Sequence, residues 1–282
     1  MQYGANIWIW VAPITVEDIK TLAPQLAAGG FDIMEIPLET INGFDYAEAA
    51  TILKDNGLGV TTCAAMGPTL DLIHPNEQFR TDGMAYITHA IEATQALGGT
   101  NLVGPIYSSV GRTWKSTDEE RARDTDLLVS QLGKLSALAE DHGVVMGIEP
   151  LNRFETSFIN LASQVNEVVD RVDSPSCKVM LDTFHMNIEE KSLGDAIRST
   201  GSRLAQLHAC ENDRGAPGSG NVTWDDVAQA LKDINFDGPV VIESFTAKVD
   251  AIARAAAIWR PMAPTQDEIA YDGIKFLRGL LG

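Results

Sequence analysis

The sequence predicts an α/β fold, namely a single (β/α)8 barrel domain that spans residues 1–282. Eight short apolar runs alternate with helical patterns, and no linker or low-complexity segment interrupts them. Such alternation is typical of a parallel sheet with crossover helices. Eight strand–helix units in about 250 residues match the (β/α)8 count. An open doubly wound sheet is the alternative, but no GxGxxG follows the first apolar run.

The predicted strands are short apolar runs bounded by turn residues or by the start of a helix. In chain order they are residues 3–10, 31–36, 58–64, 101–103, 144–149, 177–182, 204–208 and 240–243.

The predicted helices have recognisable start and stop signals. Thr15 precedes two acids in a first turn, and the glycine pair 29–30 ends that helix. The longest helix begins at residues 116–120 and ends at His142-Gly143, with leucines 127, 128, 132, 135 and 138 on one face. The other predicted helices are residues 47–56, 78–97, 161–172, 192–199, a segment that begins at 223, and 265–281.

The composition excludes several classes of partner. The chain has 21 Lys and Arg against 39 Asp and Glu, a net charge of −18, which disfavours nucleic acid and anionic membranes as partners. The three cysteines, Cys63, Cys177 and Cys210, form no CxxC pair and are expected to be reduced thiols. No apolar run approaches a membrane span and no secretory signal pattern is present, so we expect a cytoplasmic protein.

Four consecutive predicted strands each end in a side chain that binds metals. These side chains are Glu149, Asp182, His208 and Glu243. In a (β/α)8 barrel the carboxyl ends of the strands form one rim, where the active site lies, so the four side chains can converge. Three carboxylates would repel one another without a cation. The oxygen-rich set suits Mn²⁺, Mg²⁺ or Co²⁺, and Zn²⁺ remains an option.

The two glutamates predict a proton-transfer reaction. A divalent ion that chelates a carbonyl and an adjacent hydroxyl acidifies the neighbouring carbon. If Glu149 and Glu243 serve opposite faces of that carbon, one removes the proton and the other returns it, which inverts the stereocentre. A single base on one face would instead give an aldose–ketose isomerase.

Three segments carry a resemblance to a known family. They are IEPLNRFET (148–156), LDTFHMNIEE (181–190) and HACENDRGAPGSG (208–220), and they resemble the ketose 3-epimerases of the xylose isomerase-like TIM barrels. The resemblance covers nearly the whole chain. It implies a homodimer or homotetramer that inverts C3 of a free ketose of the D-allulose/D-fructose, D-tagatose/D-sorbose or L-ribulose type through a metal-stabilised cis-enediolate.

The resemblance also implies roles for individual residues. Glu149, Asp182, His208 and Glu243 would bind one metal ion, and the two glutamates would exchange the C3 proton. Glu155, His185 and Arg214 would hold the O1–O2 end of the sugar, with Trp114 and Phe245 along its far end.

Other features leave the substrate and the reaction open. Asn6-Ile7-Trp8 and residues 108–111 depart from the family pattern, so the preferred ketose stays open. Glu35 is expected to form a salt bridge, and Trp8 to be a core or subunit contact. Alternative functions are a hydroxypyruvate or sugar isomerase, a non-catalytic sugar- or metal-binding barrel, and a metal-dependent endonuclease. The endonuclease would need further metal ligands and a basic face, neither of which is evident.

Overall fold

The computed structural model describes all 282 residues, and its centre is a closed barrel of eight parallel strands in the order β1 to β8. The strands are β1 (Gln2–Asn6), β2 (Ile33–Pro37), β3 (Gly59–Cys63), β4 (Asn101–Gly104), β5 (Val145–Ile148), β6 (Cys177–Asp182), β7 (Leu204–Ala209) and β8 (Pro239–Ile242). Pairing of β1 with β8 closes the ring, with Gln2 opposite Pro239. The predicted (β/α)8 barrel is confirmed.

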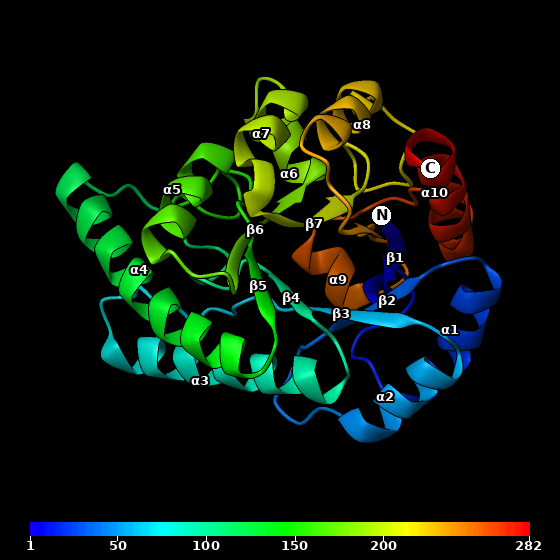
Figure 1. Cartoon of the computed structure of the whole chain (residues 1–282), viewed down its shortest axis with the longest axis horizontal. Coiled ribbons are helices and arrows are strands. Elements are labelled where there is room, and N and C mark those ends of the chain that lie inside the picture. Colours follow the sequence, from blue (N-terminus) through cyan, green and yellow to red (C-terminus); the bar gives the residue numbers. More distant parts are fainter.

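Helices surround the barrel, as Figure 1 shows. The α-helices of the chain, of which α9 lies over the ring and not around it, are α1 (Val16–Ala28), α2 (Tyr46–Asp55), α3 (Glu77–Ala96), α4 (Asp118–Asp141), α5 (Ala162–Val172), α6 (Thr183–Glu189), α7 (Leu193–Thr200), α8 (Trp224–Asp233), α9 (Asp250–Ala255) and α10 (Gln266–Leu281). None of them combines the length and the apolar character that a membrane crossing requires.

Side-chain caps explain where several helices begin. Thr15 and Asp18 form a reciprocal capping box at the start of α1, and Thr117 and Glu120 form another at the start of α4. Each box satisfies backbone N–H groups that the first helical turn leaves free. These helices therefore start where the sequence predicts.

The first strand is shorter than predicted. Residues 3–10 read as one apolar run, but β1 ends at Asn6 and a 3₁₀ helix, η1 (Ile7–Ile9), follows. The Asn6 side chain accepts a hydrogen bond from the Trp8 N–H at 2.9 Å, which caps this turn. The prediction of a strand to residue 10 is wrong because a local side-chain bond competes with the ladder.

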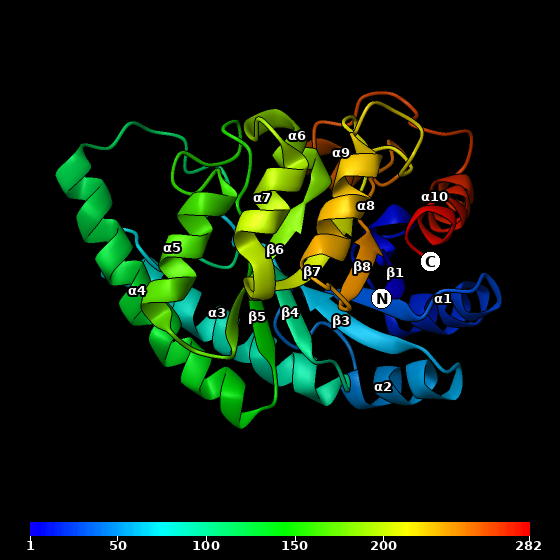
Figure 2. The same ribbon diagram turned by 45° about the horizontal axis from the view of Figure 1, so that its top comes forward.

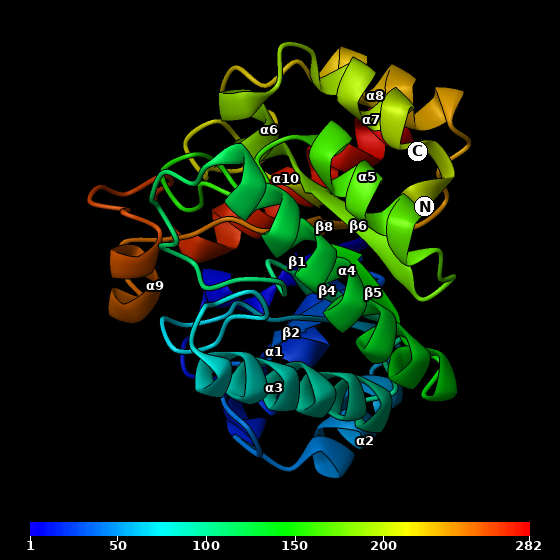
Figure 3. The same cartoon turned by 90° about the vertical axis from the view of Figure 1, so that its left-hand side faces the viewer.

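Two short helices were not predicted. Asp182 ends β6 and also caps α6, accepting a hydrogen bond from Phe184 N–H at 2.8 Å. The other, α9, follows β8. Figure 2 shows it beyond the tips of the β6 and β8 arrows, and in Figure 3 it projects on the side where α3 and α4 begin. It therefore lies at the carboxyl end of the barrel.

Gly104 shapes the exit of β4. It has a φ of +126°, and a Cβ at this position would collide with the Ala64 carbonyl oxygen. Glycine alone adopts this backbone region without strain. The Gly104 carbonyl accepts the Glu149 N–H at 3.1 Å, so this glycine helps to place the first acid of the rim.

Candidate active site

Four buried side chains converge at the carboxyl ends of β5 to β8. Glu149 follows β5, Asp182 ends β6, His208 lies near the end of β7, and Glu243 follows β8. One ligand atom from each lies within 4.8 Å of those of the other three. The structure thus brings together the four residues that the sequence analysis identified at the ends of consecutive strands. We call these four residues the quartet.

Arg214 is the cation beside the quartet. Its Nη1 donates to Asp182 Oδ2 at 2.5 Å and to Glu243 Oε2 at 2.9 Å. Its guanidinium carbon lies 4.2 Å from the ring centroid of Phe184 and 4.8 Å from that of Phe245. Hydrogen bonds and two aromatic faces therefore orient this buried arginine.

His185, Asn152 and Glu155 extend the polar wall. His185 Nε2 lies 3.0 Å from Arg214 Nη2, and its Nδ1 accepts the Asn152 backbone N–H at 3.0 Å. The Asn152 side chain donates to Glu155 Oε1 at 2.7 Å. Sequence reasoning assigned Asn152 no role, although it lies within the motif 148–156, because its contacts depend on a loop conformation.

The surroundings push the two glutamates toward different protonation states. Burial raises the pKa of Glu149 well above its usual value, and the charges of Glu243 and Asp182 raise it further. Burial also opposes ionisation of Glu243, but His208 and Arg214 outweigh it and lower its pKa to about 2. When the pKa values of two neighbouring carboxyl groups differ in this way, one group can act as a proton donor and the other as a proton acceptor.

Two observations fit a divalent cation at the quartet. Glu149 Oε1 and His208 Nδ1 are buried without a hydrogen-bond partner, which costs about 1–3 kcal/mol per group. Although burial lowers it, Glu35 and Glu243 raise the pKa of His208 well above its usual value, so without a cation the ring carries a proton on both nitrogens. A bound cation would replace the Nδ1 proton, 3.4 Å from Glu243 Oε2, while Nε2 keeps its contact with Glu35 Oε1 at 2.8 Å. Arg214 and protonated His208 are the two positive groups beside the three carboxylates of the quartet. Carboxylate oxygens and an imidazole nitrogen that face one another around one point are ligands that suit a divalent metal ion.

A cavity of about 230 Å³ adjoins the quartet. The polar residues that line it are Glu149, Glu155, His185, Arg214 and Glu243, and every other lining residue is apolar. Phe245, Ile252 and Trp8 belong to this apolar part. Trp8 thus lines the cavity, whereas the sequence suggested a core or subunit contact. The available signal was the segment Asn6-Ile7-Trp8, which departs from the family pattern.

Trp114 lies outside this cavity. Its side chain is 44% exposed, and the Arg112 guanidinium stacks on its ring at 4.5 Å. Of the two apolar residues predicted along the far end of the sugar, the cavity therefore includes Phe245 and not Trp114.

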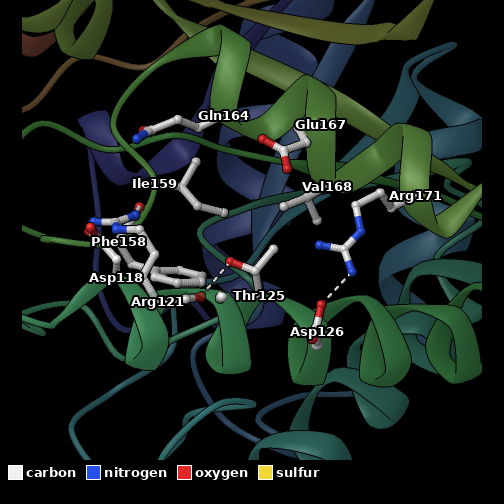
Figure 4. Close-up of a pocket in the computed structure, with 11 residues that line it drawn as sticks. Asp118, Arg121, Thr125, Asp126, Phe158, Ile159, Gln164, Glu167, Val168 and Arg171 are labelled. Carbon is white, nitrogen blue, oxygen red and sulfur yellow. Dashed lines mark hydrogen bonds and ion pairs between the residues drawn. The ribbon is translucent and has the colours of Figure 1, made fainter.

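A second hollow lies outside the barrel between α4 and α5 (Figure 4). Arg171 pairs there with Asp126 at 2.6 Å, and Arg121 donates to the Phe158 carbonyl oxygen at 2.5 Å. Both arginines of this hollow thus bind groups of the protein itself. It contains none of the quartet residues, so the cavity at the barrel rim is the candidate active site.

Comparisons with known proteins identify the family of this chain. The model of the xylose isomerase-like TIM barrel family matches residues 24–280. The D-psicose 3-epimerase of Enterocloster bolteae is 32% identical over 100% of this chain and 96% of its own. That of Agrobacterium fabrum is 34% identical over 92% of each chain. The crystal structure of D-psicose 3-epimerase with D-tagatose from Clostridium cellulolyticum H10 has a TM-score of 0.89 and 31% identity, covering 100% of this chain and 99% of that one. The chain therefore belongs to the xylose isomerase-like TIM barrels and, among them, to the ketose 3-epimerases, which are isomerases that act on carbohydrates.

Proposed function

We propose that this enzyme inverts C3 of a free ketose by proton exchange between Glu149 and Glu243, with one divalent metal ion per subunit. The observation that carries the proposal is the quartet, in which two glutamates from β5 and β8 share one buried cluster within 4.8 Å. Relatives of similar length that are named D-psicose 3-epimerases support the reaction.

Glu149, Asp182, His208 and Glu243 would hold the ion. Their oxygen-rich donor set and the unpartnered Glu149 Oε1 and His208 Nδ1 favour Mn²⁺, Mg²⁺ or Co²⁺. When bound, such an ion supplies Lewis acidity, which makes the carbon beside a carbonyl more acidic.

The protein groups then move one proton. The ionised glutamate takes the C3 proton from one face of the sugar, and the protonated glutamate delivers a proton to the other face. Exchange on two faces inverts C3, whereas exchange on one face would shift the carbonyl.

The remaining polar groups would orient the sugar. Arg214 and His185, which line the cavity, would donate to a developing negative oxygen, and Glu155 would accept a bond from a terminal hydroxyl. Trp8 and Phe245 would pack against the opposite end. The substrates to test first are D-allulose, D-fructose and D-tagatose, because a crystal structure of a similar 3-epimerase is described with each of these sugars.

Deuterium incorporation tests the reaction. With D-fructose in D₂O and Mn²⁺, we expect D-allulose that carries deuterium at C3, detected by NMR. An aldose product would indicate an isomerase instead, and no exchange with any ketose would reject the proposal. Chelator-treated enzyme is the control and should show no exchange. A homodimer or homotetramer is proposed from the family resemblance, and sedimentation of the enzyme as a monomer would contradict it.

A further inference from the structure

A buried carboxylate outside the quartet lies deeper in the barrel. Glu35, on β2, is completely buried and takes no part in the proton exchange described above. Four side chains approach its two oxygens at hydrogen-bond distance, namely Asn6 at 3.0 Å, Thr61 at 2.9 Å, Gln206 at 2.5 Å and His208 at 2.8 Å. A buried anion with four partners from strands β1, β3 and β7 is held in one orientation.

The contact with His208 defines which imidazole nitrogen carries the proton. Glu35 Oε1 lies 2.8 Å from Nε2, and a carboxylate can only accept, so Nε2 is the donor. In the neutral ring that would bind a cation, Nδ1 is then the nitrogen with the lone pair. It is buried without a hydrogen-bond partner, and it is the side of the ring that faces Glu243.

Asn6 links the same carboxylate to a second member of the quartet. Its Oδ1 accepts the Trp8 N–H, which sets the orientation of the amide. Its Nδ2 consequently points inward and lies 3.0 Å from Glu35 Oε1 and 3.5 Å from Glu243 Oε1. Glu35 and Asn6 together form a layer beneath His208 and Glu243.

We infer that Glu35 is a positioning residue for the cation site, which holds His208 in the Nε2–H tautomer with Nδ1 directed at the ion. This inference rests on the proposed function, because it requires that the quartet bind a divalent cation. Carboxylates that accept from the second nitrogen of a metal-binding histidine act in this way, and their loss weakens metal affinity by about 10- to 100-fold.

The test is a titration of chelator-treated protein with Mn²⁺ by calorimetry. Glu35→Gln preserves size and removes the charge, and we expect the Kd for Mn²⁺ to rise by about 10- to 100-fold. Thr61→Val is the matched control, because Thr61 contacts the same carboxylate but not His208. It should change the Kd by less than about threefold. Equal Kd values for wild type and Glu35→Gln would overturn the inference.

The ¹⁵N NMR spectrum of histidine-labelled enzyme loaded with diamagnetic Mg²⁺ provides a readout that a purely structural role would not produce. We expect the His208 signal, assigned by its loss in His208→Gln, to show the proton on Nε2. In Glu35→Gln the same spectrum should require about a 10- to 100-fold higher Mg²⁺ concentration. A proton on Nδ1 in the wild type would refute the inference, even if Glu35→Gln fails to fold.

Failure of the proposed function gives a different result. In that case the wild type binds no Mn²⁺ and exchanges no C3 proton. If the wild type binds and exchanges while Glu35→Gln matches it in affinity and tautomer, only the role of Glu35 is rejected. Glu35→Asp retains the charge on a side chain that is one methylene shorter, so the carboxylate lies farther from His208. It should give a Kd for Mn²⁺ between those of the wild type and Glu35→Gln.

Discussion

Glu149 and Glu243 share one cluster but have different neighbours. Glu243 lies beside Arg214 and His208, whereas Glu149 Oε1 has no hydrogen-bond partner. We expect Glu149→Gln and Glu243→Gln each to lower kcat by about 10²- to 10⁴-fold, the range that general acid–base catalysis contributes. Deuterium exchange at C3 measures the loss. Glu140→Gln, on an exposed part of α4, is the control and should keep the wild-type rate. Full turnover in either variant would favour a barrel whose glutamates are not catalytic.

Trp8 provides a test of the apolar end of the cavity. Its ring meets that of Phe245 edge to face at 6.3 Å, and its indole N–H donates to Glu39 Oε1 at 3.1 Å. Trp8→Ala should lower kcat/KM about tenfold, mainly through KM, because it removes apolar contact with the sugar. Steady-state kinetics with D-fructose and D-allulose measure this effect. Trp259→Ala removes a tryptophan that is 74% exposed, and it should leave both constants unchanged. Equal KM values for Trp8→Ala and the wild type would place the sugar elsewhere.

The sequence was informative about residues whose position follows from the strand order. The four quartet residues could be predicted to converge because each ends a neighbouring strand of one ring. The partners of Glu35 could not, because they lie on β1, β3 and β7 and meet only inside the closed barrel. The outward position of Trp114 was equally inaccessible, since it depends on stacking with Arg112 in a long loop.

At the level of elements, local signals predicted the long helices and missed the short ones. The stripes and caps of α1, α4 and α10 are visible in the sequence, because each extends over several turns. The helices α6 and α9 have only 7 and 6 residues, too few to show periodicity. Both lie where the site is built, since α6 carries His185 and α9 carries Ile252.

The capping box of α4 is expected to contribute to stability and not to catalysis. Glu120 N–H donates to Thr117 Oγ1 at 3.2 Å, and Thr117 N–H donates to Glu120 Oε2 at 2.8 Å. Thr117→Ala should reduce the free energy of unfolding by about 1 kcal/mol. Urea denaturation measures this change, and kcat should remain at the wild-type value because α4 does not line the cavity. Ser130→Ala, at an exposed position inside the same helix, is the control and should be neutral or slightly stabilising. A stability loss as large in Ser130→Ala would mean that the box contributes nothing.

On the scale of the whole molecule, the closed ring explains how distant segments form one site. Pairing of β1 with β8 brings Asn6 within 3.5 Å of Glu243, although 237 positions separate them in the chain. The same closure buries the three carboxylates of the quartet in a protein with a net charge of −18. Mutual repulsion of buried and surface acids opposes folding, so a cation that binds only the folded quartet should stabilise the entire barrel.

Thermal unfolding tests this coupling between the quartet and the fold. Mn²⁺ at 100 times its Kd adds about 2.7 kcal/mol to the folded state, so the Tm of chelator-treated enzyme should rise by about 5 °C. Calorimetry with and without Mn²⁺ measures the shift, with NaCl added to equal ionic strength because salt alone screens surface repulsion. In Asp182→Asn the Mn²⁺-dependent shift should fall below about 1 °C while the response to NaCl persists. If Asp182→Asn and the wild type gain equally from Mn²⁺, the ion acts on the acidic surface, and the quartet is not the site at which it binds.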